Sequence, residues 1–422
     1  MTHRFNVNIC NVTSALQPKD IFYIYMNITS IDIFCHCVDN YGDAGVVYRF
    51  ATELKIARPE YRVRVFIDCM TTINAIVKDI DPSKDIQEYA GITYINTASI
   101  NQEAAYTLGV ADVMVEAFAC HIPAPLLELA YDRSRLIINL EHLSAEDWVT
   151  GCHLKESLLG RGSVRKYYFM PGLREDTGGL IINSRLRETR SRGLLDERSF
   201  INNTAGTDTG DNKLIGTIFT YERGFDTLLA DLNSIGRETV LLVFGDKSQR
   251  GMSATFKRLS GVLDIPAQNT QHLSIHTYKN IHIIYMPFID QYSYDTLLCC
   301  ADFNIVRGED SLARAILSGK PFVWNAYIQD NKYQKVKVKA LLDTMRPYYE
   351  SRGYSDIFNG YCDLMQDFND APAESPRQTT SERYIEFFEN LQKHKHIASG
   401  IYYFIENNCN LVINFCKFLE EI

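Results

Sequence analysis

Two aspartates, Asp39 and Asp43, lie four residues apart in a short polar turn that follows an apolar run and precedes a helical stretch. Two like charges this close together favour different protonation states, so one aspartate could act as a general base while the other orients it. A structural alternative stays open, in which Asp43 caps the helix and Asp39 ends the strand.

The same turn contains Asn40 and two glycines, Gly42 and Gly45. Glycine lets a ligand come close to the backbone, but a dinucleotide fingerprint needs a third glycine at the right spacing, and the sequence lacks it. This argues against a nicotinamide or flavin oxidoreductase. The run Cys35 to Cys37 lies on the expected strand, where the cysteines and the histidine point to opposite faces, so no metal site is expected there.

A second charged turn follows a later apolar run and consists of Arg307, Gly308, Glu309, Asp310 and Ser311. The amide groups at the start of a helix, together with an arginine fork and a hydroxyl, can bind a diphosphate. The two acidic residues would repel phosphate and fit sugar or ribose hydroxyls better. In the alternative interpretation, Glu309 and Asp310 complement the helix dipole and Arg307 pairs with one of them.

Aromatic residues follow the strands expected in the second half of the chain: Phe219, Tyr221 and Phe288, with Gln291 close behind. An aromatic ring at a strand end can stack on a nucleobase, and a glutamine amide can read the edge of a pyrimidine. Aromatic rings also fill protein cores, and the sequence alone does not exclude this for any of the three.

The composition is that of a globular protein of two domains. The chain has 422 residues, 46% of them hydrophobic, with 43 basic and 52 acidic residues and a net charge of −9. There is no block of like charges, so no direct nucleic-acid partner is expected.

No apolar run reaches the roughly 18 residues that span a bilayer, and no signal peptide is evident, so we expect a cytoplasmic protein with no membrane contact. Eleven cysteines without a framework spacing indicate free thiols.

Short β-branched runs alternate with helical stretches, which predicts an α/β protein with two doubly wound, Rossmann-like domains that face each other across a cleft. The strands expected in the first unit are Ile31 to Val38, Val63 to Ile67, Ile92 to Ile95, Val113 to Glu116 and Leu136 to Leu140. Those in the second are Leu214 to Thr220, Val240 to Phe244, Ile281 to Tyr285, Phe303 to Val306 and Phe322 to Trp324. The expected division is an N-terminal extension (1–29), a first domain (30–185), a polar linker (186–213), a second domain (214–385) and a helical tail (386–422).

Several motifs, in order from Ile31 to the helix after Trp324, resemble the EarP family of bacterial protein-arginine rhamnosyltransferases. These motifs are Asp39 to Gly45, Glu116 to Cys120, Asn139 to Val149, Pro171 to Gly172, Thr177 to Leu180, Phe219 to Glu222, Pro287 to Phe288, Arg307 to Ser311 and Pro321 to Trp324. The chain departs from the family pattern in residues 1–29, which precede its usual start, and at Asn325, where the family tends to have histidine.

The resemblance implies a GT-B glycosyltransferase whose first domain holds the acceptor and whose second domain holds the nucleotide sugar. It implies transfer of rhamnose from dTDP-β-L-rhamnose to an arginine of translation elongation factor P, with inversion and without a metal or other cofactor. The implied catalytic residues are Asp43, Asp39 and Glu309. The expected donor contacts are Asn40, Gly42, Phe219, Tyr221, Phe288, Gln291, Arg307, Asp310 and Ser311. Two alternatives stay open, a GT-B transferase with another sugar or acceptor and a non-catalytic nucleotide-binding protein.

Overall fold

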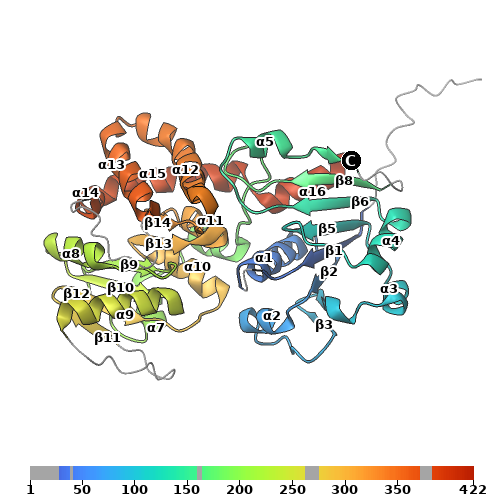
Figure 1. Ribbon diagram of the computed structural model, residues 1–422, viewed down its shortest axis with the longest axis horizontal. Coiled ribbons are helices and arrows are strands. Elements are labelled where there is room, and N and C mark those ends of the chain that lie inside the picture. Colours follow the sequence, from blue (N-terminus) through green and yellow to red (C-terminus); the bar gives the residue numbers. More distant parts are fainter. Residues whose placement is uncertain (1–27, 39–40, 159–163, 262–274, 371–382) are drawn as a thin grey trace, which may run out of the picture.

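The protein has two lobes, each built around one β-sheet. The computed structural model describes residues 28–38, 41–158, 164–261, 275–370 and 383–422. Figure 1 shows the first lobe in blue to green and the second in yellow to orange, with α1 on the side of the first lobe that faces the second.

The first sheet has eight strands among the described residues, in the order β3-β4-β2-β1-β5-β6-β8-β7. The inner strands run parallel, and only β3 and β7 pair antiparallel to their neighbours. The strands are β1 (Ser30–Cys35), β2 (Arg62–Ile67), β3 (Ile86–Tyr89), β4 (Ile92–Asn96), β5 (Val113–Ala117), β6 (Leu136–Leu140), β7 (Glu156–Ser157) and β8 (Arg165–Phe169).

Helices cover both faces of this sheet, which is why β1 is buried along its whole length. Side chains alternate between the faces of a strand, so Ile33 packs with Phe50 of α1 while Phe34 packs with Leu126 of α4. The helices of this lobe are α1 (Tyr41–Ala57), α2 (Met70–Ile76), the 3-10 helix η1 (Thr97–Ser99), α3 (Gln102–Leu108), α4 (Ala124–Arg133) and α5 (Trp148–Cys152).

The second sheet has six strands among the described residues, in the order β11-β12-β10-β9-β13-β14, and β11 is antiparallel to β12. The strands are β9 (Leu214–Ile218), β10 (Thr239–Val243), β11 (Ile275–Tyr278), β12 (Ile281–Tyr285), β13 (Phe303–Arg307) and β14 (Phe322–Asn325). The helices are α8 (Asp226–Ser234), α9 (Asp246–Ser260), α10 (Gln291–Cys300), α11 (Gly308–Ser318), the 3-10 helix η2 (Asp330–Lys332), α12 (Tyr333–Glu350), α13 (Ser355–Asp370) and α14 (Arg383–Glu389).

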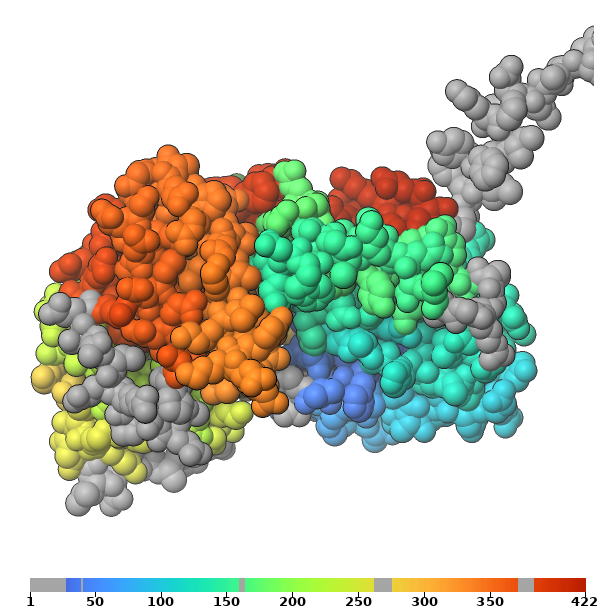
Figure 2. Space-filling view, turned by 45° about the horizontal axis from the view of Figure 1, so that its top comes forward, coloured from blue at the N-terminus to red at the C-terminus, as the bar shows by residue number. Residues whose placement is uncertain are grey.

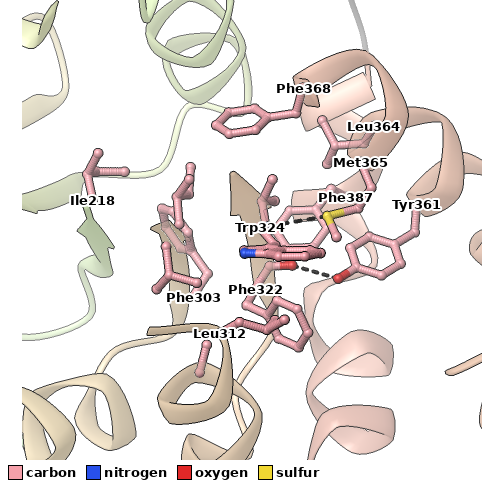
Figure 3. Packing of buried hydrophobic residues seen from close by; sticks show 14 of the residues in the cluster. Ile218, Phe303, Leu312, Phe322, Trp324, Tyr361, Leu364, Met365, Phe368 and Phe387 are labelled. Carbon is pink, nitrogen blue, oxygen red and sulfur yellow. Dashed lines mark hydrogen bonds between the residues drawn. The ribbon is translucent and has the colours of Figure 1, made fainter. Parts of the chain in front are cut away.

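The core of the second lobe is rich in aromatic side chains where β13 and β14 meet α13 (Figure 3). The hydroxyl of Tyr361 donates a hydrogen bond of 2.7 Å to the carbonyl of Phe322, which ties α13 to β14. The indole nitrogen of Trp324 donates to the carbonyl of Gly308 over 2.9 Å. This bond holds the first residue of α11 against the core, so the charged turn Arg307 to Ser311 is anchored to the buried part of the lobe.

The segment 186–213, predicted as a polar linker, is largely helical. It contains most of α6 (Ser184–Ser191) and all of α7 (Glu197–Ala205), and α7 packs on α10 of the second lobe. Few of its side chains are apolar, and Leu186 is the one buried residue of α6. The regular spacing of apolar residues that indicates a helix is therefore almost missing from this segment.

The chain returns to the first lobe at its end. Helix α15 (Leu391–Asn408) packs on α11 and α12, and α16 (Leu411–Glu421) packs on α1. Phe415 of α16 is fully buried, and its ring centroid lies 5.1 Å from that of Phe50 and 5.4 Å from that of Phe169. In Figure 2 the dark red end of the chain covers part of the green first lobe. The boundary expected at residue 385 falls inside α14, and α16 belongs to the core of the first lobe.

Most predicted strands agree with the structure within one to three residues, and Leu136–Leu140 and Ile281–Tyr285 agree at both ends. Strands β3, β7 and β8 are not among the predicted strands, and they carry charged residues such as Arg165 and Glu156. Among the described residues, the helices are too short or too polar for any of them to cross a membrane.

Candidate active site

Asp43 stands in the first turn of α1, directly beyond the carboxyl end of β1. Its side chain is buried, with 5% of the residue exposed, and its Oδ2 accepts a hydrogen bond of 3.0 Å from the amide of Val38. This bond closes the turn from β1 into α1 and fixes the direction of the carboxylate. Gly42 precedes it in the helix and is partly buried, while Asp39 and Asn40 lie outside the described residues.

His142 faces the same carboxylate; it lies in the motif Asn139 to Val149, but its spacing along the chain does not connect it with Asp43. Its Nε2 lies 3.9 Å from Oδ1 of Asp43. The imidazole stacks on the ring of Phe118, with centroids 4.1 Å apart and planes 7° from parallel. Phe118 and Ala119 take left-handed φ angles of 59° and 54°, which bring the chain after β5 to this position. The positions that follow β1, β5 and β6 therefore meet at Asp43.

Residues on either side of Asp43 contact the second lobe. The ring of Tyr41 lies 5.4 Å from that of Phe288, which is 58% exposed and therefore is not a core residue. A Cβ atom at Gly45 would lie 2.6 Å from Nε2 of Gln291, so glycine is needed for this close approach. Oε1 of Gln291 is buried and has no hydrogen-bond partner among the described residues. Asp43 is thus placed at the boundary of the two lobes, beside an acceptor atom that a ligand could use.

Phe219, Tyr221 and Arg307 form one group at the carboxyl ends of β9 and β13. The guanidinium carbon of Arg307 lies 4.3 Å from the ring centroid of Phe219 and 5.1 Å from that of Tyr221. Its Nη1 donates a 3.1 Å hydrogen bond to the carbonyl of Thr220. Gly245 takes a left-handed φ of 73°, and a Cβ there would meet the ring of Phe219 at 2.6 Å. The group is a cation in contact with two aromatic rings.

The charged turn after β13 begins α11, and each of its acidic residues has a cationic neighbour. Lys337 of α12 donates a 3.0 Å hydrogen bond to Oε1 of Glu309. Oδ1 of Asp310 lies 3.7 Å from Nε of Arg314, one turn along the helix. Ser311, the next residue of the helix, is buried. The acidic residues are therefore paired with side chains from the core and from α12.

Arg49 of α1 connects this region to the first lobe. Its Nη1 and Nη2 donate hydrogen bonds of 2.5 and 3.0 Å to the two carboxylate oxygens of Asp295 in α10, and its Nε lies 3.8 Å from Oδ1 of Asp310. Burial disfavours the charged form of Arg49 and by itself would lower its pKa. The carboxylates of Asp295 and Asp310 outweigh this effect and raise the pKa above the ordinary value. Burial, reinforced by the charge of Arg49, lowers the pKa of Arg314.

A comparison with known proteins identifies the family. Residues 31–420 match the family model described as Elongation-Factor P (EF-P) rhamnosyltransferase EarP. The chain belongs to this family. The resemblance based on motifs is thereby confirmed, and the match includes both lobes and the returning helix α16.

Curated relatives agree with the EarP match. Proteins named protein-arginine rhamnosyltransferase from Pseudomonas aeruginosa and Pseudomonas putida are 33% identical over 323 residues and 32% identical over 317 residues. These alignments cover 75% and 74% of this chain and 81% and 80% of the relatives. The chain is therefore an enzyme, a glycosyltransferase of the protein-arginine rhamnosyltransferase family.

The fold also agrees with a solved EarP structure, determined to explain EarP-mediated arginine glycosylation of translation elongation factor EF-P. That structure superposes with a TM-score of 0.59 at 21% identity, over 93% of this chain and 99% of the other. The predicted α/β fold, two doubly wound domains of the GT-B class, is confirmed.

A second contact joins the two lobes of this EarP family member near the site. The hydroxyl of Tyr333, the first residue of α12, donates a 2.5 Å hydrogen bond to Oε1 of Glu146 in the first lobe. Oε2 of Glu146 accepts a further bond of 3.1 Å from the hydroxyl of Ser144. Since Lys337 of the same helix holds Glu309, α12 links the region after His142 to the charged turn of the second lobe.

Proposed function

We propose that this enzyme transfers L-rhamnose from dTDP-β-L-rhamnose to an arginine side chain of translation elongation factor P, with inversion at the anomeric carbon. The observation that carries the proposal is the match to the EarP family over residues 31–420. This match includes both lobes and every charged turn described above. The proposal puts the enzyme in the cytoplasm, where a translation factor is found.

Asp43 is the general base in this proposal. A guanidinium is a poor nucleophile while it is protonated, and its pKa lies far above neutral, so it needs a carboxylate that orients it and accepts a proton during attack. Asp43 is buried, fixed by the amide of Val38 and located where the lobes meet. The acceptor nitrogen bonds to the anomeric carbon, the bond from that carbon to the diphosphate oxygen breaks, and the nitrogen loses its proton to Asp43. Asp39 would hold the geometry of this base.

The second lobe binds the donor. Arg307 offers guanidinium donors to the diphosphate, and the amide groups at the start of α11 add positive potential on the same side. This charge stabilises the leaving dTDP, so the proposal includes no metal or other cofactor. Phe219 and Tyr221 supply aromatic faces, and Oε1 of Gln291 supplies the acceptor that a thymine imide N–H requires. Asn40, Gly42, Phe288, Asp310 and Ser311 complete the proposed donor contacts.

Glu309 has a supporting role in this scheme. Its carboxylate accepts a bond from Lys337, which leaves its second oxygen for a sugar hydroxyl or for the charge that develops on the sugar ring. A test of this role is a comparison of Glu309→Gln with Glu309→Ala. If the carboxylate stabilises the transition state, both should slow transfer more than they weaken dTDP binding.

Intact-mass spectrometry of the cognate elongation factor P tests the function directly. The factor is incubated with the enzyme and dTDP-β-L-rhamnose, beside Asp43→Asn and the control Asp132→Asn, which alters an exposed carboxylate of α4. A single deoxyhexose on an arginine with the wild type and the control, and a strongly reduced rate of the same modification with Asp43→Asn, support the proposal. Modification only with a UDP-sugar, or only of another acceptor, replaces it with the broader GT-B alternative. Failure to bind dTDP rejects the donor assignment.

A further inference from the structure

Helix α1 carries the proposed base on one side and contacts the donor-binding lobe with another. Gly45, Arg49 and Glu53 follow at four-residue intervals, which places them on one face of the helix. Figure 1 shows α1 next to α10 and α11 at the boundary of the lobes, and α1 contacts α11. The orientation of this helix therefore decides where Asp43 stands relative to a donor bound at α11.

Arg49 makes a specific contact on this face. Both ends of its guanidinium fork bind Asp295, and the two side chains are 7% and 4% exposed. The amide of Asn183 lies 3.4 Å from the same carboxylate. A planar fork on a carboxylate fixes direction as well as distance, and a lysine cannot reproduce it. This buried pair therefore sets the angle between α1 and α10.

The Nε atom of Arg49 adds a second connection, to the donor side. It lies 3.8 Å from Oδ1 of Asp310, and Nε of Arg314 lies 3.7 Å from the same oxygen. Both Nε atoms are buried and lack a hydrogen-bond partner among the described residues. These separations exceed hydrogen-bond length. Asp310 is thus attracted by two buried cations without being bonded to either Nε atom, so a change at Arg49 also changes the field at Asp310.

We propose that Arg49 is a positioning residue for the transfer reaction: its fork on Asp295 holds α1, and with it Asp43, in register with the donor held at α11. The inference rests on the proposed function for its donor site and general base. Arg49 itself need not touch either substrate. It acts by keeping two groups from different lobes at reacting distance, and a displacement of about 1 Å can slow a reaction about 100-fold.

The test uses Arg49→Lys, which keeps the charge and loses the fork. We expect kcat for transfer to fall about 10- to 100-fold, while the dissociation constant of dTDP changes less than about 3-fold. A double-mutant cycle with Asp43→Asn adds a readout that a purely structural role would not move. Once the base is gone its position no longer matters, so Arg49→Lys should slow Asp43→Asn little further.

The matched control is Arg64→Lys. Arg64 is also buried and forks onto one carboxylate, that of Asp32, with two bonds of 2.6 Å, but this pair lies entirely within the first lobe. The control should lower stability and the fraction of enzyme that binds dTDP, while kcat per binding site stays unchanged. The inference is overturned if Arg49→Lys behaves like this control, keeps full activity, or adds its full effect to that of Asp43→Asn.

A spectroscopic measurement separates failure of the inference from failure of the proposed function. Spin labels on p-acetylphenylalanine at Tyr106 of α3 and Ser234 of α8, both exposed, report the distance between the lobes without using the cysteines. We expect Arg49→Lys to shift or broaden this distance and Arg64→Lys to leave it unchanged. If the wild type transfers no rhamnose, the proposed function fails, and an unchanged distance in Arg49→Lys would reject the positioning role as well.

Discussion

Replacement of Arg307 by glutamine should weaken dTDP binding far more than it weakens the fold. A hydrogen bond to a charged group contributes about 1.5 to 3 kcal/mol, which corresponds to a roughly 10- to 150-fold loss of affinity when the guanidinium is removed. The cost to the fold is smaller because the carbonyl of Thr220 keeps a second donor, the hydroxyl of Ser248 at 3.0 Å. Loss of the contacts with the two rings should cost about 1 kcal/mol of unfolding free energy.

Isothermal titration calorimetry with dTDP measures the affinity, and urea unfolding measures the stability. Arg307→Lys is informative beside Arg307→Gln, since lysine keeps the charge but neither forks onto a diphosphate nor stacks flat on a ring. The control is Arg250→Gln, which removes an exposed arginine that pairs with Glu222 in the same lobe. If Arg307→Gln binds dTDP as tightly as the control does, the assignment of the diphosphate to this group is wrong.

Three further predictions concern the fold and the boundary between the lobes. Phe415→Ala should lower the free energy of unfolding by about 3 to 5 kcal/mol, measured by urea unfolding, because it opens a cavity in the first lobe. Burial lowers the pKa of His394 to about 4, so this histidine is neutral in the fold and takes up a proton on unfolding below the unfolded value of 6.5. The neutral His394 should therefore contribute about 3 kcal/mol to the free energy of unfolding above pH 6.5, and this contribution should be lost as the pH falls towards 4. In a series of unfolding curves at different pH values, His394→Gln should show a weaker dependence of stability on pH. Gly45→Ala should change stability by less than about 1 kcal/mol but weaken dTDP binding several-fold, because only the mobile end of Gln291 must move.

Each of these three has an outcome that contradicts its reasoning. A loss below about 1 kcal/mol for Phe415→Ala would mean that α16 does not complete the core of the first lobe. An unchanged pH slope in His394→Gln would assign the acid sensitivity to other groups. Tight dTDP binding by Gly45→Ala would remove Gln291 from the donor site, while a large loss of stability would show that the two lobes cannot adjust at this contact.

The sequence predicted those parts of the fold that depend on local pattern. Strands such as Leu136–Leu140 are continuous apolar runs because helices cover both faces of the sheet, and such runs are recognisable without any tertiary information. In contrast, β8 (Arg165–Phe169) is the second strand from one edge of its sheet and begins with two charged residues, of which Arg165 is exposed, and α6 is polar nearly all round. Both elements form because of their neighbours, so a local pattern could not indicate them.

The same limit applies to the site. Asp43 and Arg307 could be singled out because each follows a strand and precedes a helix, the place where such sheets bind ligands. Arg49 and Asp295 are 246 residues apart, and nothing local pairs them. The only signal was an arginine within a helix whose neighbours Val47, Phe50 and Ala51 are apolar, which indicates a buried charge that needs a partner. His142 lies within the motif Asn139 to Val149, but no local pattern connects it with Asp43, because their meeting depends on the path of the chain after β5 and β6.

The return of α16 to the first lobe has a consequence for the order of events during synthesis. Domains commonly fold as they emerge from the ribosome, with the N-terminal one first. Here the first lobe lacks Phe415 and its neighbours until α16 has been translated, so its apolar face beside α1 stays uncovered while the whole second lobe is being made. A growing chain of this enzyme therefore offers chaperones an unfinished surface for longer than its domain order suggests, and the lobe that is translated first is the last to close.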